Sequence, residues 1–505
     1  MVVVGMAKLG AGVIFAAPAA IVTLLTRMHG SVGLAAPTGA MLAEENAAEA
    51  CALFRHLPQL AEKLAWRSLG ASVTPIHRCT LDTPSGAPVE FFVKREDLAS
   101  SLYGGNKVRT LQHQLAVIES RLAQGDARCA NIHVCGTGGS NQVVATAVHA
   151  RHRLPEVTPV WLDKDKADLD NTLNMLSTLS MPLAGSYHWG EPLAMLRRLL
   201  GAAFGGDGVI VTMGGNCPAG VLGQVGGVLE LAEQVAAGAM PPPDRIYLPL
   251  GSSCTAGGLI IGLALARHLG LGGLDGDGDG DGDGDGDGDG DGDDARGGRR
   301  VRIVGVPVHE ALVLLQVRLG LHTAWASQWV PFTLRHTLRT SCEELRALGG
   351  PDLLEPSLRI LREEVDILTD AELVGTYGGH SERSRAAAAA YDATGRLYDY
   401  GGDGAAVVDA PPLWLCGHFV AKAFAPLLDD AASEELRGKT LLLWQTKSAV
   451  QPRGEQDEWA AMRAMPPSVR AWADDGSAES ALRPGSVDTA GGAADDYRHL
   501  MTPLP

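Results

Sequence analysis

From about residue 66 onward, short apolar runs alternate with helix-like stretches, and this alternation constrains the fold more than any other feature. The runs expected to form strands are 90–94, 131–135, 158–162, 208–212, 245–250 and 301–308. Between strands, apolar side chains recur at a helical period, as in Val108, Leu111, Leu115, Ile118 and Leu122. This pattern predicts an α/β fold with a mainly parallel sheet whose two faces are covered by helices.

Length and charge limit the class of protein further. A chain of 505 residues exceeds one average domain, so two or more cores are expected. The net charge of −17 argues against a nucleic-acid surface, although eleven aspartates lie between Asp275 and Asp294 and the balance without them would be −6. This Asp-Gly run cannot bury apolar surface, so we expect a disordered, solvated insertion at 273–298. Calcium binding by its carboxylates is the alternative.

The two ends of the chain differ from its middle in residue composition. Residues 1–43 contain Lys8 and Arg27 but no acidic residue, and the apolar stretch 10–25 is short for a membrane span. We interpret residues 1–60 as a leader with a candidate targeting segment; a membrane anchor and a disordered leader are the alternatives. The polar stretch 451–505 is expected to be a flexible tail.

The number and spacing of the cysteines bear on the cellular compartment of the protein. The chain has eight cysteines and no C-x-x-C motif, so neither a zinc ribbon nor a disulfide framework is indicated. Reduced thiols in an intracellular compartment are expected, and the acid-free N-terminus adds chloroplast or mitochondrion as candidate locations.

Three loops rich in Gly, Ser and Asn follow predicted strands, at 104–107, 136–141 and 251–258. In parallel sheets such loops meet at the carboxyl ends of the strands, where ligands bind. The loop "GSSCTAGG" at 251–258 opens an apolar helix, so its main-chain N–H groups and the helix dipole favour an anion such as phosphate. It lacks the G-K-[ST] of a nucleotide P-loop, and a plain strand-to-helix turn is the alternative.

The other two loops supply a lysine and a pair of polar side chains. Lys107 follows two glycines, and a desolvated lysine loses its proton readily and can form a Schiff base. A solvated surface lysine is the ordinary alternative. Ser140 and Asn141 lie at a second helix start, where they can cap the helix or bind a carboxylate. A phosphate cradle combined with such a lysine points to pyridoxal phosphate.

Five stretches in this order resemble one known family. They are "TPIHRC" (74–79), "FVKREDLASSLYGGNKVRTLQHQLA" (92–116), "GTGGSNQVVATAVHA" (136–150), "GGNCPAGVLGQVGGVLEL" (214–231) and "LGSSCTAGGLIIGL" (250–263). The chain resembles the pyridoxal-phosphate enzymes of the tryptophan-synthase-beta type, of fold type II. Within them it resembles the group of D-cysteine desulfhydrase and 1-aminocyclopropane-1-carboxylate deaminase.

The resemblance implies an architecture and a set of roles. It implies two domains, each with a mainly parallel sheet flanked by helices, and a cofactor in the cleft between them. The large domain would comprise 61–109 and 212–450, and the small domain 110–211. Lys107 would carry the cofactor's aldehyde and shuttle the α proton of the substrate, Asn141 would bind the ring oxygen, and Ser140 would bind the substrate carboxylate. The phosphate would be held by Ser253, Cys254, Thr255, Ala256 and Gly257.

The chain departs from the family mostly downstream. Gln142 stands where the family usually has histidine, and "QTKS" (445–448) where it has "HTGG". Phe419 stands at the usual tyrosine and Val420 at the residue that faces the pyridine nitrogen; neither side chain can donate a hydrogen bond. The nearest candidates for the family's glycine–tyrosine loop are Tyr377, which we take as the third catalytic residue, and His380.

The expected function is that of a pyridoxal-phosphate dependent lyase which releases sulfide, pyruvate and ammonia from D-cysteine. The alternatives are 1-aminocyclopropane-1-carboxylate deaminase, another amino-acid lyase or racemase, and a degenerate homologue that binds the cofactor without turnover. The expected partner is a small amino acid, with no nucleic acid, no metal and no membrane. The resemblance also implies a homodimer.

Overall fold

The computed structural model describes most of the chain, and all structural statements below concern these residues. They are 23–24, 26–44, 46–71, 73–82, 88–272, 274, 300–308, 329–375, 378–399, 409–477 and 500–505. The Asp-Gly run and Tyr377 lie outside the described residues. None of the helices in the described ranges is both long and apolar enough to cross a bilayer.

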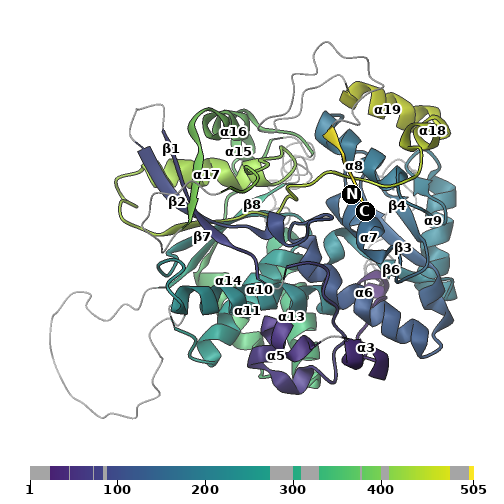
Figure 1. Cartoon of the computed structure of the whole chain (residues 1–505), viewed down its shortest axis with the longest axis horizontal. Helices are drawn as coiled ribbons and strands as arrows, with labels where there is room; N and C mark the ends of the chain where they lie inside the picture. The colour runs from purple at the N-terminus through teal and green to yellow at the C-terminus, as the bar shows by residue number, and fades with distance from the viewer. Residues whose placement is uncertain are drawn as a thin grey trace, which may run out of the picture.

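A seven-stranded sheet forms one half of the molecule, on the left in Figure 1. Its strand order is β10-β1-β2-β11-β7-β8-β9, and β2, β11, β7, β8 and β9 run parallel, whereas β1 pairs antiparallel with both β2 and β10. The strands are β1 (Ile76–Asp82), β2 (Pro88–Lys94), β7 (Arg245–Leu250), β8 (Arg302–Pro307), β9 (Val365–Ile367), β10 (Arg396–Asp399) and β11 (Leu441–Trp444).

Helices cover both faces of this sheet, as the sequence predicts. Central strand β11 shows why: Leu442 and Trp444 pack in one apolar cluster, and Leu441 and Leu443 pack in the other. One face carries α10 (Pro218–Ala236), α11 (Cys254–His268), α13 (Trp329–Ala347) and α14 (Leu354–Glu363). The other carries α15 (Ala371–Val374), α16 (Glu382–Thr394) and α17 (Val420–Ala432).

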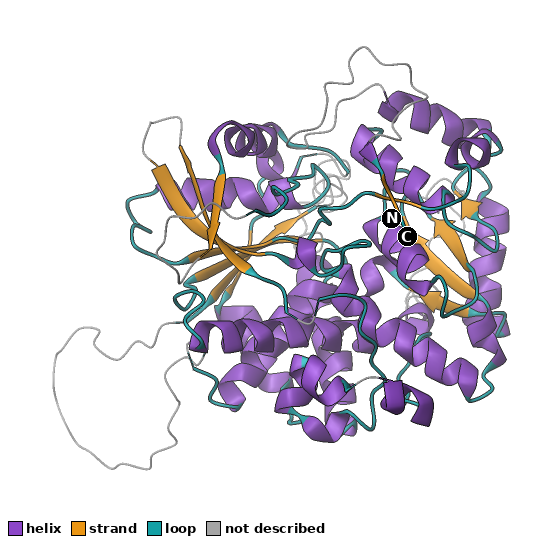
Figure 2. Cartoon of the chain, in the orientation of Figure 1, coloured by secondary structure: helices purple, strands orange, loops and turns teal. Residues whose placement is uncertain are grey.

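A four-stranded parallel sheet, with order β5-β4-β3-β6, forms the other half of the molecule (Figures 1 and 2). Its strands are β3 (Ile132–Gly136), β4 (Val157–Trp161), β5 (Tyr187–His188) and β6 (Val209–Val211). Its helical elements are α6 (Lys107–Ala123), η3 (Ala127–Ala130), α7 (Asn141–Ala150), α8 (Leu169–Leu179), α9 (Pro192–Leu200), η4 (Gly201–Gly205) and η5 (Met213–Gly215). The two sheets confirm the predicted α/β class.

The N-terminal region differs from the predicted leader over the residues that the structure describes. Leu53, Phe54 and Leu60 are fully buried, and Leu53 and Phe54 belong to α5, which packs on α10. Their apolar side chains complete the core beneath the large sheet, so at least residues 52–60 are part of the folded body. The elements here are α3 (Gly39–Glu44), α4 (Ala47–Ala50), α5 (Ala52–His56), η1 (Pro58–Leu60) and, further on, η2 (Glu96–Leu98).

The C-terminal region also differs from the prediction of a flexible tail. Residues 458–477 form two helices that contact α8, and strands β12 and β13 pair in parallel. Val469 and Trp472 are buried there, which supplies the apolar contact that holds the segment in place. The elements are α18 (Glu458–Arg463), α19 (Pro467–Ser477), β12 (Pro452–Arg453) and β13 (Thr502–Pro503). Residues 478–499 lie outside the described ranges.

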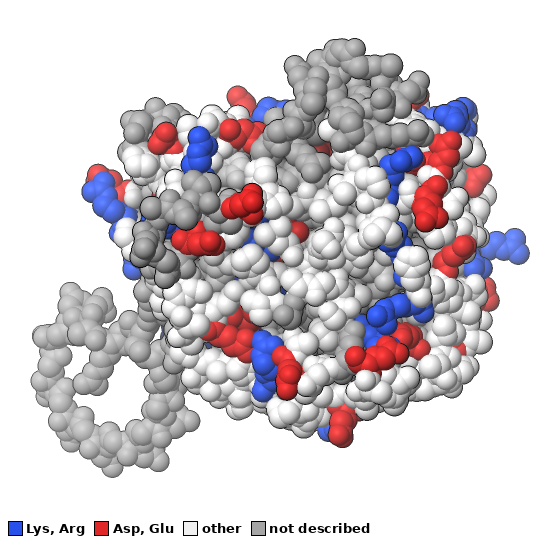
Figure 3. Space-filling model, viewed as in Figure 1, with Lys and Arg blue, Asp and Glu red and all other residues white. Residues whose placement is uncertain are grey.

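Charged side chains of both signs are interspersed on the face in Figure 3. Neither sign gathers there into a continuous stripe of the kind that binds a nucleic-acid backbone.

Candidate active site

The turn between β7 and α11 presents main-chain donors at a helix start. Ser253 has a φ of 71°, a left-handed conformation that is unusual for a residue with a side chain. The first intrahelical bond after it runs from Gly257 N–H to the Ser253 carbonyl, at 2.8 Å. The amides of Thr255 and Ala256 therefore precede the first bonded turn, where helix N–H groups lack intrahelical partners. This arrangement suits an anion.

The predicted phosphate donor Gly257 is different, because its N–H is used inside the helix. A Cβ at this position would lie 2.7 Å from Thr337 Cγ2 on α13, so the residue is needed for close packing. Gly257 thus lets α13 approach α11, and its role as a phosphate donor stays a prediction.

The glycine pair before Lys107 is explained by backbone crowding. A Cβ on Gly104 would lie 2.0 Å from the Asp97 carbonyl oxygen, and one on Gly105 would lie 2.5 Å from the Thr446 carbonyl oxygen. Gly105 also has a φ of +90°, which residues with a Cβ rarely adopt. The pair lets the chain pass between two other loops and begin α6 with Lys107 facing inward.

Lys107 and the turn after β7 lie on either side of Gly214. The Lys107 Nζ atom is 3.3 Å from the Gly214 carbonyl oxygen. A Cβ on Gly214 would lie 3.7 Å from Lys107 Nζ and 2.2 Å from Ser252 Oγ, so a larger residue would fill the space between the amine and the turn. Asn106 joins the same two elements, because its Nδ2 donates to Thr255 Oγ1 at 2.7 Å.

The ionisation of Lys107 is shifted toward the neutral amine. The residue keeps partial exposure, but its amino group is enclosed by protein. Burial lowers the Lys107 pKa from 10.5, and the nearby Cys254 thiol opposes this only in part. Burial raises the pKa of Cys254 to about 12, so this thiol is neutral at physiological pH and supplies no full counter-charge.

A buried ion network fixes the start of α6. Arg109 Nε donates to Glu96 Oε2 at 2.6 Å, and its Nη2 donates to Glu230 Oε1 at 2.9 Å. Lys94 Nζ donates to the same Glu230 oxygen at 2.5 Å. The stretches "KRED" and "GGNKVR" are thus coupled through their charged side chains, and this coupling orients the turn that carries Lys107.

The third loop brings Asn141 into a polar cluster. Its Oδ1 accepts hydrogen bonds from Tyr103 Oη at 2.8 Å, from Asn174 Nδ2 at 3.0 Å and from Lys447 Nζ at 3.2 Å. Ser140 precedes it as the N-cap of α7, and its side chain makes no capping hydrogen bond. The Ser140 hydroxyl is therefore not used by the helix.

The residues predicted to replace the family's tyrosine and ring-nitrogen partner lie at the start of α17. A Cβ on Gly251 would lie 3.5 Å from Phe419 Cε1, so Phe419 packs beside the start of the turn after β7. Val420 is fully buried within the apolar cluster on one face of the large sheet. Tyr377 lies outside the described residues. His380 is described, and burial lowers its pKa to about 3, with Arg385 and Lys422 acting in the same direction.

Two side chains in this region were not predicted from the sequence to belong to the site. Lys447, in "QTKS", is 1% exposed and contacts Asn141 and Asn174. His418 stacks on Phe419 with ring centroids 4.0 Å apart, and its Nδ1 is 3.2 Å from Asn171 Oδ1. The replacement of glycine by lysine at 447 was the one available signal, because a long charged residue at a glycine position requires space or a partner.

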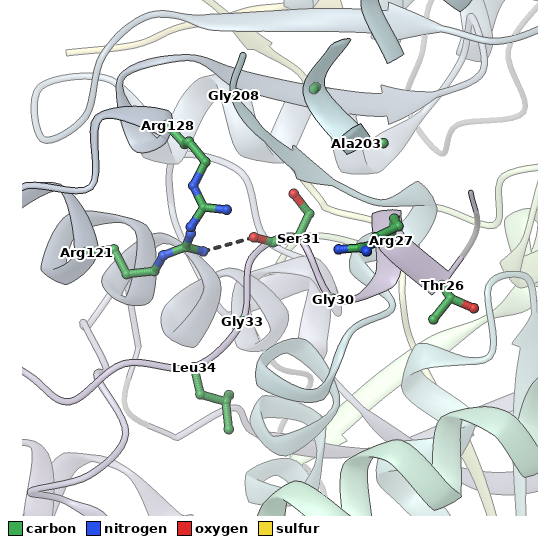
Figure 4. A pocket seen from close by; sticks show the side chains of 11 residues that line it. Thr26, Arg27, Gly30, Ser31, Gly33, Leu34, Arg121, Arg128, Ala203 and Gly208 are labelled. Atoms are coloured by element: carbon green, nitrogen blue, oxygen red, sulfur yellow. Dashed lines mark hydrogen bonds between the residues drawn. The ribbon is translucent and has the colours of Figure 1, made fainter. Parts of the chain in front are cut away.

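A cavity of about 380 Å³ lies elsewhere, between the N-terminal segment and the four-stranded half (Figure 4). Its lining includes Arg27, Ser31, Arg121 and Arg128. Arg121 and Arg128 both bind Asp126, and Arg121 also donates to the Ser31 carbonyl at 2.9 Å. None of the three Gly-rich loops lines this cavity, so it is separate from the candidate active site.

Residues 67–273 match the family model described as "Pyridoxal-phosphate dependent enzyme". The matched segment contains Lys107, Ser140, Asn141 and the turn after β7. This segment is therefore similar to the pyridoxal-phosphate dependent enzymes, a family whose members bind pyridoxal phosphate.

A curated relative is the nocardicin C-9' epimerase of Nocardia uniformis subsp. tsuyamanensis, 35% identical over 193 residues. The match covers 36% of this chain and 54% of the relative, so the chain spans about half the length of that protein. Among solved structures, an "ACC deaminase homologue" is 20% identical with a TM-score of 0.48, covering 78% of this chain and 94% of that one. The threonine synthase of yeast is 9% identical with a TM-score of 0.43, covering 89% of this chain and 91% of that one.

The described residues fit pyridoxal phosphate. The helix start after β7 offers main-chain donors where a phosphate would lie. Gly214 leaves open the space between Ser252 and Lys107 that any larger residue would fill. A buried amine with a lowered pKa lies beside that space. Lys107, Ser253, Thr255 and Asn141 are the residues that would hold the cofactor.

Proposed function

We propose that this protein is a pyridoxal-phosphate dependent lyase that acts on a small amino acid, with D-cysteine as the first candidate. When bound, the cofactor supplies an aldehyde for the substrate amine and a ring that withdraws electrons from the α-carbon. The site residues are proposed with it: Lys107 as the covalent anchor and proton carrier, Ser140 for the substrate carboxylate, and Tyr377 as a third catalytic residue. Asn141 would bind the ring oxygen, and Ser253, Cys254, Thr255 and Ala256 would surround the phosphate.

The observation that carries this proposal is the state of the Lys107 amine. A lysine must be neutral to attack an aldehyde or to accept a proton. Burial lowers the pKa of Lys107, and the amine lies 3.3 Å from the carbonyl oxygen of Gly214, where a Cβ would meet Ser252 of the donor-rich turn. The same amine is therefore available for bonding to the cofactor and for proton transfer at the α-carbon.

Support for D-cysteine over 1-aminocyclopropane-1-carboxylate comes from Phe419. Loss of sulfide from a β-carbon requires an α-proton acceptor, which Lys107 provides. Opening a cyclopropane ring requires a further group that attacks or protonates the ring, and the phenyl ring of Phe419 can do neither. Phe419 lies beside the turn after β7 and stands where the resembling family has tyrosine.

A second candidate is inversion of configuration at the α-carbon. The curated relative is named as an epimerase, and removal of an α proton is a first step that an epimerase shares with a lyase. The two reactions differ in their second step, because an epimerase returns a proton to the opposite face and releases no fragment.

The experiment that tests the proposal is an assay of the purified chain, loaded with pyridoxal phosphate, on D- and L-cysteine and a panel of other D- and L-amino acids. A lyase yields sulfide, pyruvate and ammonia from D-cysteine. An epimerase yields the other enantiomer and, in D₂O, incorporates deuterium at the α-carbon. Cofactor uptake without either product contradicts both and identifies a binding protein without turnover.

The role of Lys107 is tested by borohydride reduction and peptide mapping. In the wild type, the reduced cofactor should be attached to Lys107, and Lys107→Ala should lose the attachment and at least about 10³-fold in turnover, since it removes a group acting in several steps. Lys63→Ala, a surface lysine that donates to the Leu348 carbonyl, is the matched control. Attachment at another lysine would contradict the assignment.

We also propose that the protein is a homodimer, because of the resemblance stated above. We further propose that it is located in a chloroplast or mitochondrion, because its N-terminal stretch lacks acidic residues. Light scattering should give twice the mass of one chain, and a fluorescent fusion of the intact chain should localise to one of these organelles. A monomer, or diffuse cytosolic fluorescence, would contradict the respective proposal.

A further inference from the structure

Lys447 lies deep in the cluster that surrounds Asn141. It follows β11 by three residues, is 1% exposed, and packs its amine over the Trp414 ring at 4.1 Å from the ring centre. Its Nζ lies 3.0 Å from Asn174 Oδ1 and 3.2 Å from Asn141 Oδ1. Lys447, which lies just past a strand of the seven-stranded sheet, thus contacts two helices of the four-stranded half through its amine.

The chemistry of an ammonium group fixes both amides. A lysine ammonium has three donors and no acceptor, so each neighbouring amide must turn its oxygen toward it. Asn174 then directs its Nδ2 to the Gly139 carbonyl at 2.8 Å and to Asn141 Oδ1 at 3.0 Å. A donor-only group at position 447 therefore orients both amide oxygens, and Gln451 Nε2 also donates to Asn174 Oδ1, at 3.3 Å.

Tyr103 acts in the same direction. Burial raises the pKa of Tyr103 well above 10.0, so its hydroxyl stays protonated and can donate. It donates to Asn141 Oδ1 at 2.8 Å. With three donors directed at its oxygen, Asn141 cannot exchange its oxygen and nitrogen without losing three hydrogen bonds. The Asn141 NH₂ group therefore faces away from these three donors, and the residue as a whole is 8% exposed.

We propose that Lys447 is a positioning residue for the cofactor. It holds the Asn141 amide so that the NH₂ group is presented to the ring oxygen of bound pyridoxal phosphate, and its charge favours the ionised form of that oxygen. The inference rests on the proposed function, because it assigns Asn141 to the ring oxygen. It adds a residue from the end of β11, where the resembling family has a glycine.

Other titratable groups face the same cluster and set the background for a pH experiment. Cys416, before α17, is a buried thiol whose pKa is raised by burial, with Lys447 lowering it and Asp170 raising it. Asp170 lies on α8, and His149, on α7, contacts the Tyr103 carbonyl through its Nε2 at 2.9 Å. Burial lowers the pKa of His149 to about 4, so it is neutral above about pH 5. All of these groups are unchanged in the variants below.

The test compares wild type, Lys447→Met, Lys447→Gln and the control Lys439→Met in titrations with pyridoxal phosphate. Methionine keeps the length but has no donor, and glutamine keeps a donor without the charge. Lys439 precedes β11 at its other end, is half exposed, and has a carboxylate partner in Asp244 at 3.7 Å. The readouts are the dissociation constant and the pH midpoint at which the absorption band of the bound cofactor shifts.

For Lys447→Met, the dissociation constant should rise about tenfold, the effect of one charge-assisted hydrogen-bond arrangement. The pH midpoint of the band should rise by about one unit, because removal of a nearby cation disfavours the ionised oxygen. Lys447→Gln should shift the midpoint similarly and lose about threefold or less in affinity, since a donor remains. Lys439→Met should match wild type in both.

The outcomes separate this inference from the proposed function. Wild-type protein that takes up no pyridoxal phosphate would overturn the proposed function and the inference with it. Wild-type uptake with an unchanged constant and midpoint in folded Lys447→Met would overturn the inference alone. Folding is followed by circular dichroism, and if the methionine variant does not fold, an unshifted midpoint in Lys447→Gln is the contradicting result.

Discussion

At the scale of single residues, the site is built as much by missing side chains as by present ones. Gly104 and Gly105 leave room for two carbonyl oxygens, and Gly214 leaves room for the Ser252 side chain beside the Lys107 amine. Each position would be blocked by a methyl group. The reactive lysine is therefore placed by crowding of the surrounding backbone, which restricts where α6 can begin.

Gly105→Ala tests this explanation, with Gly125→Ala as its matched control. Both glycines have a φ of +90°, but a Cβ on Gly105 would lie 2.5 Å from the Thr446 carbonyl oxygen, and one on Gly125 meets nothing within 4 Å. Gly125→Ala should cost about 1 kcal/mol of unfolding free energy from backbone strain alone. Gly105→Ala should cost about 1–3 kcal/mol more, because the backbone must also move. Equal losses in chemical denaturation would contradict the crowding argument.

At the scale of elements, ion pairs between buried side chains join α6, α10 and β2. Glu230 on α10 is 1% exposed and accepts from Lys94 on β2 and Arg109 on α6. Burial alone would raise the pKa of Glu230, but Arg109 and Lys94 outweigh that effect and hold it well below 4.5. The carboxylate is thus required to balance two buried cations, and the position of α6 depends on it.

Glu230→Gln should lower the free energy of unfolding by about 3–5 kcal/mol, because it leaves two buried cations short of a counter-charge. The control is Glu233→Gln on the same helix, whose carboxylate is 32% exposed and pairs with Arg55; it should cost about 1 kcal/mol or less. Denaturation by urea measures both variants. Similar losses for the two would contradict the role of the buried network.

The pH dependence of this contribution has a definite sign. The folded pKa of Glu230 is below its unfolded value of 4.5, so its contribution is fully present above that pH and is lost as the pH falls through the folded value. Wild type should therefore lose more stability than Glu230→Gln on acidification below about pH 4.5.

The elements themselves were largely predictable from the sequence, and the reasons differ by element. The six strand-like runs correspond to β2, β3, β4, β6, β7 and β8, because buried parallel strands are continuous apolar runs. Strand β11 (Leu441–Trp444) has the same apolar run, but it has only four residues and was not predicted. Short β5 and β9 have two and three residues, too few to show a period.

The candidate site was predictable in part. The turn after β7 follows its strand directly, and Lys107 comes after β2 and the short helix η2, so local order along the chain places both near the ends of strands. Lys447 and His418 reach the site from segments far along the chain from the α7 and α8 residues they contact. Sequence spacing carries no information on such contacts, and only the tertiary structure shows them.

At the scale of the whole molecule, the C-terminal helices support the loop that carries Asn141. Trp472 on α19 is buried, and its Cη2 lies 3.0 Å from where a Cβ on Gly138 would be. Its Nε1 donates to the Asp165 carbonyl at 2.9 Å, and its ring meets Trp189 edge to face at 5.6 Å. The last part of the chain is thus a structural part of the four-stranded half.

Trp472→Ala should cost about 3–5 kcal/mol of unfolding free energy through the cavity it leaves. Amide exchange should rise in residues 136–142, because the loop loses the surface on which Gly138 packs. Phe204→Ala, at a position that is 53% exposed, is the control and should change stability by about 0.5 kcal/mol or less. Unchanged exchange in that loop, measured by mass spectrometry, would contradict the supporting role of α19.

The packing of residues 458–477 on α8 also affects how the chain folds during its synthesis. Strands β3, β4 and β6 and helix α8 emerge from the ribosome before residues 458–477, whose helices pack on α8. Until residues 458–477 emerge, the nascent chain exposes the face of α8 that they cover in the folded protein. Ribosome-bound intermediates should therefore recruit chaperones through α8, and a chain truncated before residue 458 should aggregate.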